Sequence, residues 1–319
     1  MRSIAGVLGL AAATATGLAL WERLAVQRDH RRYPHPSQLI DIGGRSLHYE
    51  EAGEGPVTVV LEAGLASDST SWDRVFPLLS RTAHVIRYDR AGMGWSEAGP
   101  LPRTSTRINE DLWDLLQGVA PDHRYLLVGH SRGGIWQRLL AAHHPEAIAG
   151  LVLVDSSSEY ELDDPGLYAS HRRLSLALNS ASSVPVARRL VTLAAHLRAS
   201  RLESGEVPTP PALVANLISP KGAAAFASEV DQTAATYTTV KAIRDAERGF
   251  PWPVVVLSRG YHGRSATADA EARLQHRLAE LTPDTLHVVA PHSGHFIPMS
   301  SPELVAEAVD SALRAAVPT

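Results

Sequence analysis

Short runs of β-branched residues alternate with stretches of helical spacing along most of this chain, and that alternation constrains the fold more than any other feature. Apolar runs bounded by turn residues are typical of buried parallel strands, and apolar residues spaced three and four apart are typical of helices that cover a sheet. The expected strands lie at 57–61, 85–88, 125–128, 151–154, 253–257 and 286–290. The expected helices lie at 69–80, 105–119, 132–143, 268–281 and 302–315, with Ser105 as a cap. The pattern predicts an α/β fold with a mostly parallel sheet covered by helices on both faces.

Two parts of the chain depart from this alternation. A hairpin over 39–51, turned at Gly43-Gly44, is predicted to open the folded part. Residues 159–247 show no strand pattern, are interrupted by several prolines and are too long for a loop, so they predict a helical insertion. The organisation we expect is an N-terminal hydrophobic segment and linker (1–37), a first core part (38–158), the insertion (159–250) and a second core part (251–319).

Charge and composition exclude several classes of function. The formal net charge is -4, with 30 basic and 34 acidic residues, so the chain has no broad attraction for nucleic acid. With no cysteine, the chain cannot form disulfides, thiolate metal sites or a thiol nucleophile. The histidines are scattered and form no pattern of metal ligands, so no metal site is predicted.

Residues 3–21 form an uncharged run that is flanked by basic residues on both sides. Its length lies between that of a signal-peptide core and the roughly 20 apolar residues that span a bilayer. Because Leu20, Trp21 and Glu22 stand where a small-x-small cleavage site would be, we favour an uncleaved transmembrane anchor. A cleaved signal peptide, which would mean export, stays open. The basic excess after the run favours a cytoplasmic catalytic domain, although the side of the membrane also stays open.

The pentapeptide Gly129-His130-Ser131-Arg132-Gly133 has the pattern Gly-x-Ser-x-Gly, which alone is only suggestive. Here it follows an expected strand and precedes an expected helix, the setting in which a sharp turn lifts a serine hydroxyl above the sheet edge. The two glycines let strand and helix approach each other closely. We therefore predict that Ser131 is a nucleophile; a serine that merely caps the helix is the alternative.

Four motifs, in order, resemble those of the α/β-hydrolase family over roughly residues 38–315. They are Leu61–Leu65, similar to the family's oxyanion loop; Asp89–Ser96, similar to its Asp-x-x-Gly-x-Gly-x-Ser turn; the Ser131 pentapeptide; and Ser293-Gly294-His295. The resemblance implies an α/β-hydrolase fold in which the insertion forms a lid, and a serine hydrolase that uses no cofactor. Ala63 stands where the family often has histidine, so the oxyanion loop lacks its usual side-chain brace. We assign Asp89–Ser96 to structure, because no step of the reaction requires it.

The reaction that the resemblance implies assigns further roles. Acyl transfer needs donors for the oxygen that becomes negative, and the backbone amides of Leu65 and Arg132 are the candidates. The general base should be a histidine that follows the nucleophile in sequence and lies near the carboxyl edge of the sheet. His295, a few residues after the last expected strand, fits this position best, with His292 in the same loop as its competitor.

The acid that orients the base is not where the family usually has it. That place, the loop after the next-to-last strand, is here 257–263 and contains no carboxylate. Asp155 ends the strand after the nucleophile helix, a position that some α/β-hydrolases use instead, and it is our first candidate. Asp269 is the alternative acid, although a carboxylate at the start of a helix also interacts favourably with the helix dipole.

A serine at this turn implies an acyl-enzyme, unlike the carboxylate of the related haloalkane dehalogenases and epoxide hydrolases. We therefore predict hydrolysis of a carboxylic ester of a small molecule, with an apolar acyl group as the simplest expectation for a leucine-rich lid. Amide, thioester and carbon–carbon bond hydrolysis use the same machinery and stay open. A hydrolase-like ligand-binding protein with little turnover is the alternative from another class, and the oligomeric state is left open.

Overall fold

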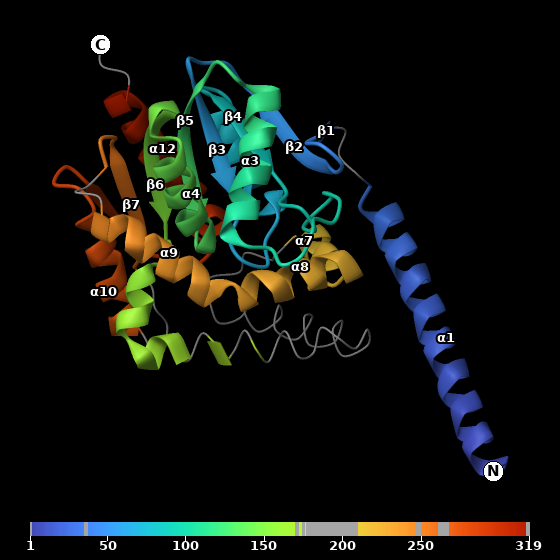
Figure 1. The fold of residues 1–319 in the computed structure, drawn as a ribbon. Helices are drawn as coiled ribbons and strands as arrows, with labels where there is room; N and C mark the ends of the chain where they lie inside the picture. The colour runs from blue at the N-terminus through green and yellow to red at the C-terminus, as the bar shows by residue number, and fades with distance from the viewer. Residues whose placement is uncertain are drawn as a thin grey trace.

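The structure is a computed structural model that describes residues 2–34, 38–169, 172–173, 176, 210–246, 250–260 and 268–316. It contains an eight-stranded sheet in the order β1-β2-β4-β3-β5-β6-β7-β8 (Figure 1). The strands are β1 (Leu39–Asp41), β2 (Ser46–Ala52), β3 (Val57–Glu62), β4 (His84–Tyr88), β5 (Arg124–His130), β6 (Ile148–Val154), β7 (Val254–Arg259) and β8 (Leu286–Ala290). β1 and β2 are antiparallel to their neighbours, and β3 to β8 are all parallel. The predicted mostly parallel sheet is confirmed.

The central strands are buried on both faces, which is why their sequences are nearly continuous apolar runs. Side chains on one face pack with α2 (Phe76–Leu79) and α12 (Pro302–Ala316). Side chains on the other face pack with α3 (Ser105–Val119), α4 (Arg132–His143) and α10 (Ala268–Ala279). The sheet is therefore the middle layer of three, and the predicted helices at 105–119, 132–143, 268–281 and 302–315 form its covers (Figure 1).

Two local predictions are wrong. The stretch 69–80 is not one helix but a 3₁₀ turn, η1 (Ser69–Trp72), followed by α2. The Asp68 side chain caps η1 by accepting from the Thr70 amide, and Pro77, in the first turn of α2, favours a new helix start there. The cap of α3 is Thr104, whose hydroxyl accepts from the Arg107 amide at 3.2 Å, and Ser105 is already helical.

The segment between β6 and β7 holds η3 (Glu159–Asp163), α7 (Pro211–Leu217), α8 (Pro220–Asp231) and α9 (Thr233–Ala246). The described part of this segment contains helices and no strand, as predicted for the insertion, while 170–171, 174–175 and 177–209 lie outside the described residues. Figure 1 shows α7, α8 and α9 at the end of the sheet where the parallel strands finish. This is the end at which open parallel sheets bind ligands.

The N-terminal residues form one helix, α1 (Arg2–Arg32), which extends away from the sheet in Figure 1 and includes the first part of the expected linker. Within the described residues, no helix combines the length and the apolar character needed to cross a membrane. The predicted transmembrane helix is therefore not supported: residues 3–21 are helical, but alanine, glycine and threonine take many of the places where larger apolar side chains would be needed.

The close approach of β5 and α4 gives a first prediction. A Cβ atom at Gly129 would lie 2.5 Å from both the backbone nitrogen and the Cα atom of Gly134, closer than packed atoms allow. We expect Gly129→Ala to lower the free energy of unfolding by about 1–3 kcal/mol in urea titrations. Gly17→Ala on α1, where a Cβ meets nothing within 4 Å, is the matched control and should cause no loss. Equal effects of the two substitutions would contradict the explanation.

Candidate active site

Ser131 lies at the turn between β5 and α4 in a backbone conformation that is unfavourable for serine, with φ 53° and ψ -123°. Three backbone hydrogen bonds hold the turn. The Ser131 amide donates to the Val154 carbonyl at 3.0 Å, and the Ser131 carbonyl accepts from the amides of Gly134 at 3.1 Å and Ser157 at 2.9 Å. The turn is thus locked between the first turn of α4 and the end of β6.

His295, in the loop after β8, reaches this serine. Its Nε2 atom lies 3.0 Å from Ser131 Oγ, and its Nδ1 atom lies 2.6 Å from Asp155 Oδ2. An ionised carboxylate can only accept, so the ring proton lies on Nδ1 and the Nε2 lone pair faces the serine hydroxyl. The predicted competitor, His292, is exposed. The structure brings Ser131, His295 and Asp155 together in the order of a nucleophile, a base and an orienting acid.

Asp155 follows β6 directly and has a positive φ of 41°. Its carboxylate is fully buried and contacts Arg259 at the end of β7: Oδ2 lies 2.9 Å from Nε, and Oδ1 accepts from the Arg259 amide at 3.2 Å. Burial by itself raises the pKa of Asp155, but the Arg259 charge and the hydrogen bond from His295 outweigh burial, so the pKa lies below its ordinary value. Asp155 therefore stays ionised beside the imidazole.

The alternative acid, Asp269, is exposed in the first turn of α10, and the described residues include no hydrogen bond between it and His295. Asp269 thus has the structural position that the helix-dipole interpretation describes. Sequence reasoning did not identify Arg259 as a partner of Asp155. The signal that could have found it is an arginine two residues after the expected strand 253–257, in the stretch where a carboxylate was sought.

The proposed oxyanion donors lie on both sides of Ser131. Arg132 begins α4, and the Gly64-Leu65 backbone packs so closely that a Cβ on Gly64 would come within 3.0 Å of Ser131 Cβ. Among the described residues, neither the Leu65 amide nor the Arg132 amide donates a hydrogen bond. The Leu65 side chain packs against the apolar cluster that Phe226 of α8 helps to form. The role of these two amides remains a prediction.

The loop that carries Leu65 is braced by Arg90, which sequence reasoning did not identify. The guanidinium donates to the carbonyls of Ala63 at 2.8 Å and Gly64 at 3.0 Å, and it pairs with Glu62 at 2.7 Å and with Glu229 of α8 at 2.9 Å. Arg90, Glu62 and Glu229 are all buried, and burial raises the pKa of Glu62 to about 7 although the Arg90 charge lowers it. An arginine thus supplies the bracing that Ala63 cannot.

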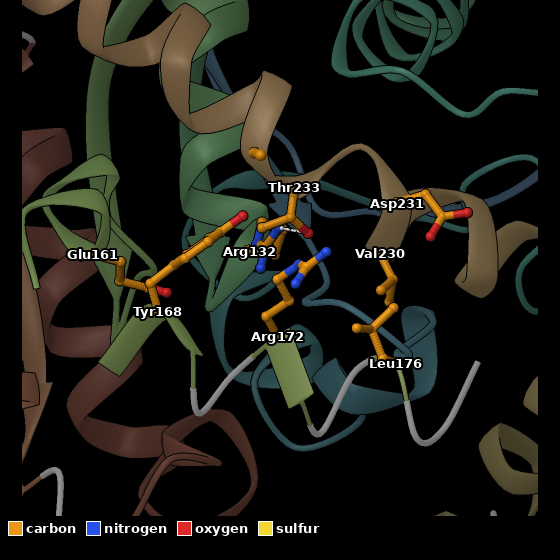
Figure 2. A pocket seen from close by; sticks show the side chains of 9 residues that line it. Arg132, Glu161, Tyr168, Arg172, Leu176, Val230, Asp231 and Thr233 are labelled. Carbon is orange, nitrogen blue, oxygen red and sulfur yellow. Dashed lines mark hydrogen bonds between the residues drawn. The ribbon is translucent and has the colours of Figure 1, made fainter. Parts of the chain in front are cut away.

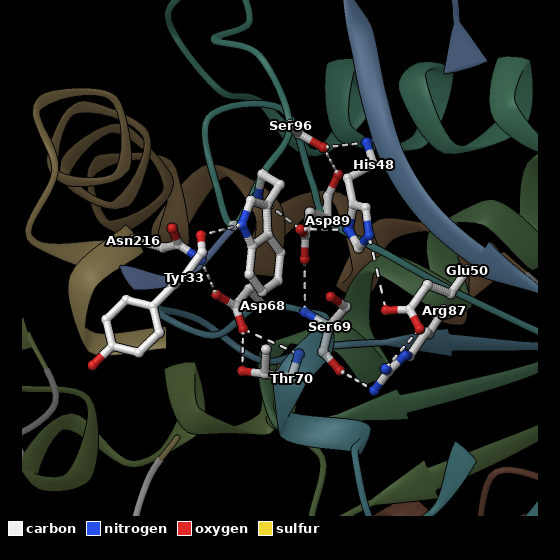
Figure 3. Close-up of polar contacts among 12 residues, drawn as sticks. Tyr33, His48, Glu50, Asp68, Ser69, Thr70, Arg87, Asp89, Ser96 and Asn216 are labelled. Carbon is white, nitrogen blue, oxygen red and sulfur yellow. Dashed lines mark hydrogen bonds and ion pairs between the residues drawn. The ribbon is translucent and has the colours of Figure 1, made fainter. Parts of the chain in front are cut away.

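A second polar network supports the next part of the same loop (Figure 3). Asp89, the first residue after β4, accepts from the Ser69 amide at 2.7 Å and contacts His48 Nδ1 at 2.8 Å. Asp68 accepts from Asn216 of α7 at 3.1 Å, and burial together with the Asp89 charge raises the pKa of Asp68 to about 6. These contacts agree with the structural role expected for the Asp89 turn, and they join the insertion to the core.

Comparisons with known proteins match most of the chain to one family. The family model described as "alpha/beta hydrolase fold" matches residues 57–302. The 2-(acetamidomethylene)succinate hydrolase of Mesorhizobium japonicum is 27% identical over 285 residues, which cover 86% of this chain and 93% of that protein. A 2-hydroxy-6-oxo-6-(2'-aminophenyl)hexa-2,4-dienoic acid hydrolase of Metapseudomonas resinovorans is 30% identical over 122 residues, 38% of this chain and 42% of that protein. Several other curated relatives are likewise matched over less than half of their length.

Solved structures are similar in fold. The enol-lactonase of Burkholderia xenovorans LB400 superposes with a TM-score of 0.64 at 20% identity, covering 86% of this chain and 99% of that one. A thermophilic esterase of Thermogutta terrifontis gives a TM-score of 0.65 at 22% identity, covering 88% and 99%. At these identities the likeness shows the fold alone.

His130, beside the nucleophile, gives a prediction about stability and pH. It is buried, its Nε2–H donates to the His295 carbonyl at 2.8 Å, and burial lowers its pKa from 6.5 to about 3. An unfolded chain takes up this proton near pH 6.5 and the folded chain only near pH 3, so the contribution of neutral His130 is complete above pH 6.5 and is lost as the pH falls. Between pH 7 and 5 we expect the wild type to lose about 1–2 kcal/mol more stability in urea than His130→Gln. Parallel losses in the two proteins would contradict this assignment.

Proposed function

Since this chain belongs to the alpha/beta hydrolase fold family, we propose that it is a serine hydrolase that cleaves a carboxylic ester, or a related acyl compound, of a small molecule. The observation that carries the proposal is the placement of His295 Nε2 3.0 Å from Ser131 Oγ, with Nδ1 on the buried Asp155 carboxylate. A serine hydroxyl is a weak nucleophile unless a base within hydrogen-bond reach takes its proton, and this arrangement provides that base.

The reaction proceeds in two halves. Ser131 Oγ attacks the substrate carbonyl carbon as its proton passes to His295 Nε2, and the carbonyl oxygen becomes negative. The amides of Leu65 and Arg132 donate to that oxygen, which is where fixed dipoles lower the barrier most. His295 then returns the proton to the departing alcohol oxygen, leaving an acyl-serine. Water, deprotonated by His295 Nε2, then attacks the acyl carbon. The bond between that carbon and Ser131 Oγ breaks, and His295 returns the proton to Oγ, which releases the acid and restores Ser131.

Asp155 acts through His295. Its carboxylate holds the ring proton on Nδ1 and stabilises the imidazolium that forms when Nε2 takes the serine proton. The Arg259 charge supports this role because it keeps Asp155 ionised in a buried position.

The relatives support hydrolysis in general, but not the cleavage of an ester in particular. Two of the relatives named above are hydrolases by name, and an enol-lactonase, by its name, opens a cyclic ester. A hydrolase-like protein that binds a ligand without turning it over is the alternative. Activation of Ser131 separates the two, because only an activated serine reacts with an electrophilic probe.

A fluorophosphonate probe tests the nucleophile. We expect the wild type to be labelled covalently, Ser131→Ala to show no labelling, and His295→Ala to label at least about 100-fold more slowly because the base is missing. The rates are measured by gel fluorescence on protein with a cooperative urea transition. Folded wild type that resists labelling would favour the ligand-binding alternative.

Two aspartate-to-asparagine substitutions test which aspartate orients His295. Asp155→Asn is expected to lower kcat for p-nitrophenyl butyrate by about 10⁴-fold, because an amide at this position favours the wrong imidazole tautomer. Asp269→Asn, on an exposed position, should keep kcat within about twofold. The urea midpoint of each variant controls for folding, since Asp155→Asn also removes the partner of Arg259. A reversed ranking of the two kcat values would assign the role to Asp269.

A further inference from the structure

Buried arginines in the described part of the chain follow a rule with one exception. Arg90, Arg103, Arg132 and Arg138 are each at least nine-tenths buried. A buried guanidinium is costly unless a carboxylate compensates its charge, and three of the four have one within 3.0 Å. The pairs are Arg90 with Glu62 and Glu229, Arg103 with Asp111, and Arg138 with Glu159. Arg132 makes no ion pair with any described carboxylate.

Arg132 instead has only neutral partners among the described residues. Its Nη1 donates to the Thr233 hydroxyl at 2.8 Å, and its guanidinium lies 4.8 Å from the centre of the Tyr237 ring. Its Nε is buried and has no hydrogen-bond partner in the described ranges, as is also true of Nε in Arg103 and Arg138. A guanidinium offers five N–H donors, so most of the capacity of this group is unused. Among the described residues, the Arg132 guanidinium thus has N–H donors left over that a bound anion can accept.

Arg132 lines a pocket of about 450 Å³ (Figure 2). A second arginine, Arg172, lines the same pocket and forms no ion pair with a described residue. Figure 2 shows Arg132 and Arg172 in the middle of the group, with Glu161 and Asp231 to either side. Leu176 and Val230 provide apolar wall. The carboxylates of Glu161 and Asp231 line the same pocket and balance the two arginines in formal charge, but neither forms an ion pair with Arg132 or Arg172. The two guanidinium groups therefore keep N–H donors that a bound carboxylate can take up.

We propose that this pocket binds a carboxylate group of the substrate, held by the guanidinium groups of Arg132 and Arg172. The inference rests on the proposed function, because it places the reacting acyl group of the same molecule at Ser131, the residue before Arg132. Guanidinium groups match carboxylates through paired N–H donors, and Leu176 and Val230 give the same pocket apolar wall for a carbon chain. The substrate class is therefore esters that carry a free carboxylate, such as half-esters of dicarboxylic acids. This adds a charged end to the apolar acyl group expected from the sequence.

Two matched pairs of esters test the proposal. Mono-p-nitrophenyl glutarate carries a carboxylate on its acyl side, and p-nitrophenyl pentanoate is the neutral ester of the same chain length. On the alcohol side, 4-acetoxybenzoate is matched by phenyl acetate. In at least one pair we expect the ratio of kcat/KM, charged over neutral, to fall about tenfold or more in Arg172→Met and in Arg132→Met. Arg173→Met, an exposed neighbour that does not line the pocket, should keep the wild-type ratio.

The results can separate failure of the carboxylate site from failure of the hydrolase proposal. A ratio that Arg172→Met leaves unchanged in both pairs overturns the carboxylate site, and because Arg172 is exposed this variant remains informative if Arg132→Met fails to fold. Glutarate binding to Ser131→Ala, measured as a rise in Tm, tests the site without turnover. A rise that is lost in Ser131→Ala with Arg172→Met supports the site. The same rise in a wild type that resists the fluorophosphonate probe would keep the anion site and overturn the hydrolase proposal alone.

Discussion

The strained turn at Ser131 is the constraint on which the rest of the site depends. A serine with φ 53° persists only if its surroundings hold it, and here the end of β6 and the start of α4 do so through three backbone hydrogen bonds. The glycines around the turn are needed because strand and helix meet at distances that exclude a Cβ. The same register places Asp155 at the end of the neighbouring strand, within reach of the histidine that faces the serine.

Two buried or half-buried arginines hold the groups around Ser131 in place. Arg259 keeps the Asp155 carboxylate ionised, and Arg90 holds the loop of Gly64 and Leu65 against the turn. Inside a protein the effective dielectric constant is low, so each pair is strong when satisfied and costly when broken. Arg259 is the last residue of β7 and Arg90 is the second residue after β4, and their side chains hold Asp155 and the Gly64-Leu65 loop in place.

The insertion does more than cover the end of the sheet. Glu229 of α8 pairs with Arg90, Asn216 of α7 donates to Asp68, and Thr233 of α9 accepts from Arg132. Its helices thus contact the oxyanion loop, the turn before η1 and the first residue of α4. The insertion therefore contributes both to the pocket beside Arg132 and to the support of the proposed oxyanion loop.

The sequence by itself determined most of the alternation of strands and helices and predicted the sharp turn at Ser131, because hydrophobic period and turn chemistry are local properties. It also singled out His295 as the candidate base. It narrowed the acid to two aspartates, and only the tertiary structure placed Asp155 against the imidazole, 140 residues away along the chain. Glu229, one of the partners of Arg90, lies 139 residues from it, and Asp155 lies 104 residues from Arg259. That Arg132, among the four buried arginines, lacks a described carboxylate was likewise decided by the fold, because charge pairing depends on distance in space and not on spacing in sequence.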